Sequence, residues 1–356
     1  MEKKRDITID IMKGILMLLV VSCHAQGPGH RLIYLFHMAV FFMISGYLWG
    51  DRKDVKIVPY IKRKAITLYI PYVVCNVAYV AWFLLMPTMF EREMCNRTVT
   101  GVAYEIVKII LLQGRSTMSN PSWFLAVMFI ISIAYAVVVN IIGKVTKNDR
   151  IRLGIVTVTA IAALVLGYLF YLNDFNRFQV GTICSSYAAF HMGNIIWKTL
   201  KHGRIKAGSR SMGIATIFAG GGLLLLYKFT EIELRLIDNI IINPVIYCLG
   251  MIFGWIVLRC VSAIFAKVAL LRNPLSYLGR NSMVVLCAHF AAFKMIAFLQ
   301  CLWLGLPISE VSAFPVVRVM GMWWCAYTLA GISLPLLTRH LLCTIRERII
   351  DKKNAG

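Results

Sequence analysis

Long apolar runs, each ended by charged residues or by clusters of Gly, Pro and Asn, follow one another along almost the whole chain. A run of about 20 apolar residues is the length that a helix needs to cross the hydrocarbon of a bilayer. The pattern therefore predicts ten transmembrane helices, with ends defined to within about four residues. They lie near residues 7–24, 33–49, 68–88, 122–142, 153–171, 180–197, 212–228, 240–265, 282–301 and 314–338.

We expect an all-α, polytopic bundle that forms a single domain over residues 1–356, with no appended soluble domain. The first segment lacks a small-residue cleavage site, so it is predicted to be a retained helix and not a signal peptide. The long connection 89–121 contains VAYEIVKIILLQG, whose mixed apolar and polar pattern is typical of an interfacial or re-entrant helix.

Composition and charge place the chain in a membrane. Of its 356 residues, 59% are hydrophobic and 15% are charged, and the mean hydropathy of +0.73 excludes a soluble globular protein. The net charge of +22 would suggest a nucleic-acid partner in a soluble chain. With the amino terminus inside, however, 26 of the 38 Lys and Arg residues fall in inner segments and eight in outer ones. This bias predicts that both termini are cytoplasmic and that the chain lies in the cell membrane, with no nucleic-acid partner.

The first apolar segment carries three ionisable residues, Asp10, Lys13 and His24. Such side chains are costly inside hydrocarbon and are usually functional there. At about 1.5 Å per residue, Asp10 lies about 21 Å from His24 along one helix, so the two serve opposite membrane faces. Lys13 follows Asp10 by three residues on the same helix face, which indicates either an intrahelical ion pair or the border of an inner vestibule for a charged cosubstrate.

Two histidines flank the first predicted turn. His24 ends the first helix and His37 begins the second, across the short connection AQGPGH, so both are expected on the outer side and near one shared cavity. A neutral imidazole is suited to removing a hydroxyl proton near neutral pH, which makes both residues candidate catalytic groups. The alternative is that each one is a solvated or capping residue at the interface.

Three further residues fall in the outer halves of predicted helices, namely Lys294, Arg318 and Trp123. The two cations could stabilise an oxyanion or hold an anionic substrate, or they could simply extend to the interface. Trp123 could contact substrate or belong to the aromatic belt of the membrane. The pattern alone leaves these alternatives open.

Six basic residues precede the third predicted helix on the inner side. They are Arg52, Lys53, Lys56, Lys62, Arg63 and Lys64. The simplest interpretation is positive-inside charge that also attracts anionic lipid. The sharper one is a phosphate-binding site for a cytoplasmic nucleotide-bearing donor, since Arg and Lys pair with phosphate oxygens. Composition does not choose between them.

Five segments occur in a distinctive order: RDITIDIMKGILMLLVVSCH, FHMAVFFMISGYLWG, YIKRKAITLYIPY, NPSWFLAVMF and LGRNSMVVLCAHF. In this order they resemble the membrane-bound acyltransferase-3 family, the O-acyltransferases of bacterial envelope sugars, and most closely its sugar O-acetylase branch. The resemblance runs along essentially the whole chain. It implies a ten-span core that takes an acyl group from cytoplasmic acyl-CoA and places it on a hydroxyl of a lipid-linked or surface glycan at the outer face.

The resemblance also implies roles for single residues. His24 matches the outer-end histidine of the first span, which would act as general base, and His37 matches the FHM histidine. A second group is expected to contact the donor or the acceptor: Asp10, Lys13, Arg63, Lys64, Trp123, His289, Lys294 and Arg318. Where the family often has two arginines three residues apart, Arg63 is followed by Ile66, so only Arg63 and Lys64 match that motif.

The expected function is transfer of an acyl group, acetyl by resemblance, from acyl-CoA as cosubstrate, with no permanently bound cofactor and no metal. The chain contains no Walker A, GxGxxG or HExxH sequence. Threading of the pantetheine arm through the bundle is the simpler route, and an acyl relay on the enzyme is the other. A glycan transporter or flippase, or a non-catalytic envelope assembly protein, stays open, although the chain shows no repeated halves.

Overall fold

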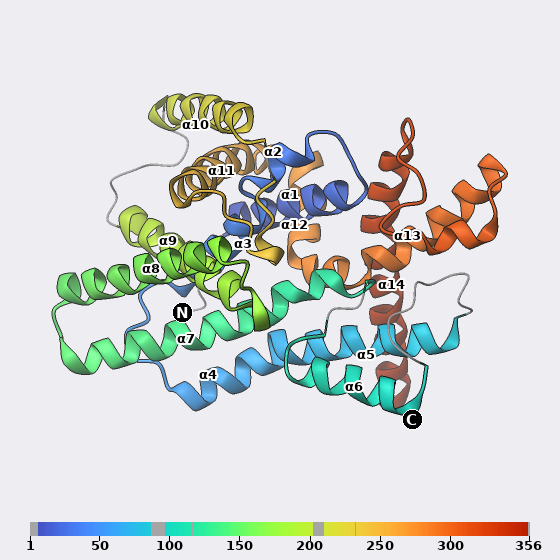
Figure 1. The fold of residues 1–356 in the computed structure, drawn as a ribbon, viewed down its shortest axis with the longest axis horizontal. Coiled ribbons are helices and arrows are strands. Elements are labelled where there is room, and N and C mark those ends of the chain that lie inside the picture. The colour runs from blue at the N-terminus through green and yellow to red at the C-terminus, as the bar shows by residue number, and fades with distance from the viewer. Residues whose placement is uncertain (1–5, 87–96, 115–116, 202–209, 232, 355–356) are drawn as a thin grey trace.

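The computed structural model describes residues 6–86, 97–114, 117–201, 210–231 and 233–354, which form helices joined by turns, with no strand among them (Figure 1). This confirms the predicted all-α class. The helices are α1 (Ile7–His24), α2 (His30–Tyr34), α3 (His37–Trp49), α4 (Ile57–Lys64), α5 (Ile70–Leu85), α6 (Val99–Ile110), α7 (Trp123–Val145), α8 (Asp149–Leu172), α9 (Val180–Lys201), α10 (Arg210–Phe229), α11 (Pro244–Phe265), α12 (Ala269–Arg280), α13 (Ser282–Leu304) and α14 (Trp323–Asn354).

Within the described ranges, nine segments are long and apolar enough to cross a membrane. The predicted span 180–197 is not among them, although it forms α9, a helix of 22 residues. The reason is that α9 buries polar residues inside the bundle, among them Thr182, His191 and Asn194. The predicted interfacial segment in 89–121 forms α6, whose sequence has one apolar and one polar face.

The third predicted helix begins at Ile57 instead of residue 68. A π-helical turn, Ala65–Tyr69, joins α4 to α5 without interruption. Pro71 explains the wide turn, because its ring would clash with the carbonyl of Thr67 in a regular α-helix and it has no N–H to bond there. Arg63 and Lys64 therefore lie in a helix and not in a loop.

The predicted start of the last span, residue 314, is wrong. Helix α14 begins at Trp323, and residues 313–322 are not helical. Pro315 cannot donate a backbone hydrogen bond, and Gly321 adopts a left-handed conformation with φ of 48°. The apolar run 314–322 fits an extended segment as well as a helix, so hydropathy alone could not locate the boundary.

Helices α3 and α9 cross at very short distance. A methyl group on Gly46 would overlap the carbonyl of Phe190, and one on Gly193 would overlap the carbonyl of Met43. Small residues allow two helix backbones to approach in this way, which is a common packing device in membranes. The crossing fixes α9, and the polar residues it carries, against the centre of the bundle.

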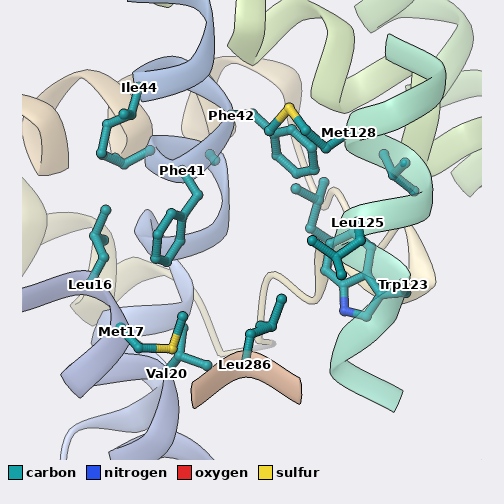
Figure 2. Packing of buried hydrophobic residues seen from close by; sticks show 14 of the residues in the cluster. Leu16, Met17, Val20, Phe41, Phe42, Ile44, Trp123, Leu125, Met128 and Leu286 are labelled. Carbon is teal, nitrogen blue, oxygen red and sulfur yellow. The ribbon is translucent and has the colours of Figure 1, made fainter. Parts of the chain in front are cut away.

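Apolar side chains from α1, α3, α7 and α13 meet at the centre of the molecule (Figure 2). Figure 2 shows Met17 and Val20 of α1 facing Phe41 of α3, with Leu125 of α7 and Leu286 of α13 alongside. A cavity of about 140 Å³ lies among these side chains, and Lys13 and Ser45 also line it. We call it the interior cavity.

Candidate functional site

Three imidazoles from separate helices converge at one end of the bundle. The rings of His24 and His289 are stacked, with centroids 5.3 Å apart and an interplanar angle of 23°. His37 lies close enough to interact electrostatically with His24. His37 and His289 are 5% and 0% exposed, whereas His24 keeps part of its surface open. We call these three residues the histidine cluster, and the end that carries them the histidine end.

Local structure explains why His24 and His37 meet. α1 ends at His24, and Gly29 turns the chain into α2 with a left-handed φ of 77°. After α2, α3 begins at His37. The predicted placement of both residues at neighbouring helix ends agrees with this geometry, while their catalytic role stays a prediction.

The backbone orients two of the imidazoles. Nδ1 of His37 lies 2.9 Å from the carbonyl of Ile33, and Nδ1 of His289 lies 2.9 Å from the carbonyl of Val285. A carbonyl only accepts, so each Nδ1 is the donor, and in the neutral ring Nε2 is left as an acceptor. Nε2 of His289 is buried and has no hydrogen-bond partner among the residues that the structure describes. The cluster thus holds an acceptor that these residues leave unused.

Aromatic rings wall the cluster on one side. Phe290 lies 5.0 Å from His24 and 4.3 Å from His289, measured between ring centroids. Two more rings extend the wall. The Phe293 ring lies 5.7 Å from that of His289, and the Phe314 ring lies 4.6 Å from that of Phe290. This apolar wall limits the access of water to the imidazoles.

Lys294 supports that wall. Its ammonium group, on α13, donates hydrogen bonds to the carbonyls of Val311 at 2.8 Å and Ala313 at 3.2 Å. The side chain is 8% exposed, so it does not extend to the interface. These bonds hold the segment that carries Phe314 against α13. A contact between Lys294 and substrate stays a prediction.

Arg318 lies outside the membrane-spanning helices, which corrects its predicted place within the last one. It belongs to the non-helical segment 313–322 and its side chain is exposed. Its carbonyl accepts a hydrogen bond of 3.1 Å from Gln300, whose side-chain oxygen accepts one of 2.7 Å from Tyr327. The structure thus attaches this segment to α13 and α14.

Trp123 begins α7 and is buried, with its ring 6.3 Å from that of Phe42. A polar network fixes the turn before it: Asn76 donates to Ser122 at 2.8 Å and accepts from Ser119 at 2.6 Å. Trp123 is therefore a rigid part of the α3 and α7 contact. Its predicted contact with substrate stays a prediction.

The opposite end of the bundle is basic. Arg63 and Lys64 both lie over the ring of Tyr60, at 5.4 and 5.6 Å from its centroid. With Arg52 and Trp49 they line a cavity of about 190 Å³, which we call the neck. The structure therefore brings the two predicted phosphate-binding residues together at one opening.

Asp10 and Lys13 lie nearer this basic end. Asp10 is buried where α12 crosses α1, because Gly279 of α12 lies directly against its carbonyl. Lys13 lines the interior cavity and is within electrostatic range of Lys64. Lys13 thus borders a cavity, as the vestibule interpretation requires.

The sequence interpretation missed a second buried histidine site. His191 of α9 is held between the hydroxyl of Tyr135 at 2.9 Å and that of Thr157 at 3.0 Å. The Tyr135 hydroxyl also lies 3.3 Å from Asn194, which donates to the carbonyl of Gly50 at 2.7 Å. The repeated tripeptide FHM, at 36–38 and 190–192, is the signal that could have drawn attention to it.

Comparison with known proteins identifies the family of this chain. A profile described as an acyltransferase domain matches residues 6–337. Nodulation protein NolL of Mesorhizobium japonicum is 28% identical over 173 residues, which cover 44% of this chain and 40% of that protein. NolL of Sinorhizobium fredii is 44% identical over 57 residues, 12% of this chain and 16% of that protein.

The chain thus aligns with less than half of the length of either relative, and no solved structure matches it. The family profile, by contrast, includes the histidine cluster, the interior cavity and the neck within its bounds. Since that match covers nearly all of a helical chain with nine segments of membrane-spanning length in its described part, the chain belongs to the membrane-bound acyltransferase-3 family.

Proposed function

We propose that this chain moves an acetyl group from acetyl-CoA, on the cytoplasmic side of the cell membrane, to a hydroxyl of an envelope glycan or lipid-linked sugar on the outer side. The observation that carries the proposal is the stack of His24 on His289, one helical turn from the residues Val20 and Leu286 that line the interior cavity. That cavity shares Ser45 with the basic neck. If the acyl donor binds at the basic end and the general base lies at the histidine end, the acetyl group needs a path between them.

The interior cavity supplies the histidine end of that path. Its lining includes Val20, one helical turn before His24, and Leu286, one turn before His289. From Lys13 to His24 the distance along α1 is about 16 Å, which is on the order of an extended pantetheine arm. The arm can therefore place its thioester beside the imidazoles while the rest of the donor stays at the basic end.

The neck supplies the other end. Ser45 lines both the neck and the interior cavity, so the two share a wall. Arg63 and Lys64 line the neck, where they can pair with donor phosphates through charge-assisted hydrogen bonds. This arrangement favours threading of the donor over a covalent relay.

In the reaction, His24 accepts the proton of the acceptor hydroxyl while that oxygen attacks the thioester carbonyl. The new C–O bond gives a tetrahedral oxyanion. Its collapse breaks the C–S bond, and the protonated His24 gives its proton to the departing thiolate. The products are the acetyl ester and the thiol of CoA.

His289 acts on the acceptor. Its Nε2, which has no hydrogen-bond partner among the described residues, can accept a hydrogen bond from an acceptor hydroxyl. The aromatic wall of Phe290 and Phe314 limits competition by water for the thioester.

Purified protein in nanodiscs, supplied with labelled acetyl-CoA and an envelope glycan fraction, tests the proposal. We expect release of the CoA thiol together with an acetyl-sized mass increase on the glycan. A comparison of cells with and without the protein adds a second readout, because loss of the whole glycan would favour a transporter. Absence of acetyl transfer from a folded preparation, with every glycan fraction tried, would exclude the enzyme.

A further inference from the structure

A second cavity, of about 440 Å³, opens at the basic end. It lies between the segment 49–53, the turn from α7 to α8 and the carboxyl-terminal part of α9. Its volume falls within the range of about 300 to 1,000 Å³ that is typical of small-molecule sites. We call it the rim cavity, and neither the histidine cluster nor the path of the acetyl group uses it.

The lining of the rim cavity is strongly basic. Five cations border it, against two carboxylates. The cations are Arg52, Lys53, Arg150, Arg152 and Lys198, and the carboxylates are Asp51 and Asp149. The excess of positive charge indicates an anionic ligand with more than one charge.

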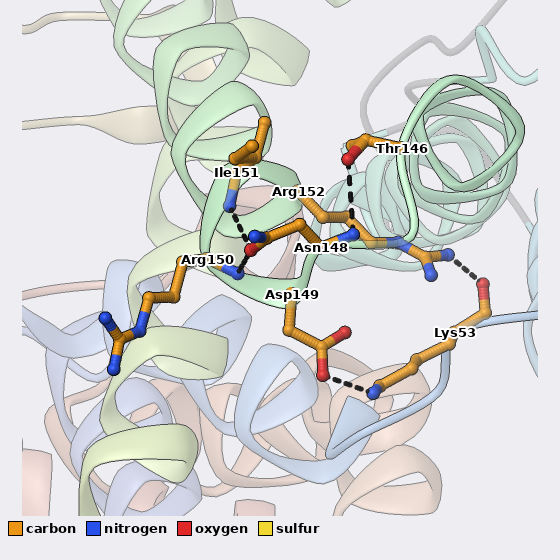
Figure 3. A network of polar contacts seen from close by, with 7 residues as sticks. All are labelled: Lys53, Thr146, Asn148, Asp149, Arg150, Ile151 and Arg152. Atoms are coloured by element: carbon orange, nitrogen blue, oxygen red, sulfur yellow. Dashed lines mark hydrogen bonds and ion pairs between the residues drawn. The ribbon is translucent and has the colours of Figure 1, made fainter.

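Part of this charge builds the rim (Figure 3). Lys53 pairs with Asp149 at 2.6 Å, and this hydrogen bond raises the pKa of the Lys53 ammonium. Arg152 donates to the carbonyls of Lys53 and of Val139. Asn148 caps α8 by accepting from the backbone N–H of Arg150 at 3.0 Å. These contacts tie the segment 50–56 to the start of α8.

Two cations are left for a ligand. Arg150 and Lys198 form no ion pair within the described part of the chain, and the guanidinium of Arg150 stands clear of the network in Figure 3. Arg150 is exposed, while Lys198 is half-buried on α9. Arg150 supplies one positive charge from the start of α8, and Lys198 supplies one from α9.

The remaining walls are aromatic and rigid. Trp49, Tyr135 and Trp197 line the cavity. Trp49 and Tyr135 are 3% and 1% exposed and close it, while Trp197 is half-buried and offers a planar base a surface. Trp49 is fixed by a hydrogen bond of 3.2 Å to the carbonyl of Arg52. Tyr135 is fixed by His191, as described above. Cations beside a partly open indole ring suit a phosphorylated nucleotide.

The rim cavity also connects to the donor path. Trp49 and Arg52 line both the rim cavity and the neck, and Ser45 links the neck to the interior cavity. The rim cavity thus shares lining residues with the neck, and the neck with the interior cavity, whose residues Val20 and Leu286 lie one helical turn from His24 and His289. A long ligand with a charged head and a narrow arm fits this order.

We propose that the rim cavity binds the nucleotide end of the acyl donor, its adenine and its 3′-phosphate and diphosphate groups. This rests on the proposed acyltransferase function. Arg150 and Lys198 pair with the phosphates, the base lies against Trp197, and the pantetheine arm leaves past Trp49 through the neck. Donor recognition is then divided between the rim cavity and the pair Arg63 and Lys64.

The test uses adenosine 3′,5′-bisphosphate, which carries the nucleotide end without the arm, and measures its binding to the purified full chain by calorimetry. The variant Arg150→Gln/Lys198→Gln is expected to lose tenfold or more in affinity and to raise the donor KM. The control variant Lys144→Gln/Lys147→Gln removes two exposed charges nearby that do not line the cavity. It should bind as the parent does, and equal thermal stability of all three proteins shows that folding is not the cause.

The outcomes separate this inference from the proposed function. Equal bisphosphate affinity in the cavity variant and the control overturns the rim cavity site, while acetyl transfer continues in both. Competition by inorganic phosphate as strong as that by the bisphosphate overturns nucleotide recognition and leaves a simple anion site. Bisphosphate binding without any acetyl transfer keeps the cavity as a nucleotide site and rejects the transferase.

Discussion

A base in a membrane bundle has to be reachable by substrate and shielded from bulk water at the same time. Among the three imidazoles of the histidine cluster, His24 is the one that keeps exposed surface, while His37 and His289 are buried and held by backbone carbonyls. This difference favours His24 as the proton acceptor of the proposed reaction.

Replacing His24 by Ala is expected to lower kcat/KM for acetyl transfer by about 100-fold to 10,000-fold, the usual contribution of a general base. His24 is the last residue of α1, so its replacement leaves the preceding turns of the helix in place. Turnover of purified variants is the measurement. His30→Ala is the matched control, because that histidine pairs with Glu233 at 2.9 Å and is half exposed. Near-normal turnover by the His24 variant would remove this residue from the mechanism.

Sequence could place His24 and His37 together because a short connection, which the structure shows to include α2, joins their helices. It could not predict that His289 stacks on His24, since α1 and α13 are far apart along the chain. The sequence also could not predict the hydrogen bonds from Lys294 to Val311 and Ala313, because every residue has a backbone carbonyl and the residue types do not show which one accepts. Long-range contacts of this kind are set by packing and not by local pattern.

At the scale of helices, the proposed binding of the acyl donor depends on Arg63 and Lys64, which α4 places in the neck. The variant Arg63→Gln/Lys64→Gln is expected to raise the donor KM tenfold or more, since each charge-assisted phosphate contact contributes about 1.5 to 3 kcal/mol. The variant Lys56→Gln/Lys62→Gln removes the same charge from the same region outside the neck. A donor titration in nanodiscs compares the two. An unchanged KM in both variants would assign this basic stretch to topology alone.

The close crossing of α3 and α9 makes a separate prediction about stability. Gly193→Ala forces a methyl group into the carbonyl of Met43, and overpacking of this kind typically costs about 1 to 3 kcal/mol. Gly220→Ala is the control, because no atom lies within 4 Å of the added methyl group. We expect the apparent Tm to fall for the first variant only. Equal Tm values would show that the crossing is looser than described.

Hydropathy predicted the helices well and their ends less well. Hydropathy identified α9 as a helix, although its buried polar residues make it less apolar than the nine segments of membrane-spanning length. It started the third helix too late because charged residues interrupted the pattern, and it started α14 too early at an apolar but extended run. Charge and apolarity report the membrane environment, whereas proline and glycine geometry determines where helices begin.

For the molecule as a whole, the orientation in the membrane remains the main prediction. The bias of Lys and Arg places Lys147 inside, and Asp174 and Glu233 outside. Single cysteines introduced at these positions, in a background without the ten native ones, can be labelled from either side. An impermeant reagent that reaches position 147 from outside would invert the assignment and with it the side on which the histidine cluster faces its acceptor.

The enclosed histidine cluster has an electrical consequence. In the threaded reaction, the hydrogen that leaves the outer hydroxyl departs with the thiol on the donor side, so no net charge crosses the membrane. A covalent relay on a residue that is ionised between turnovers would instead release that proton outside and take another from inside to protonate the thiolate, moving one elementary charge per turnover. One charge across 100 mV corresponds to about 2.3 kcal/mol, or roughly 50-fold in rate. In proteoliposomes with an imposed potential, the threaded enzyme is expected to run at one rate whatever the voltage, and a strongly voltage-dependent rate would point to the relay.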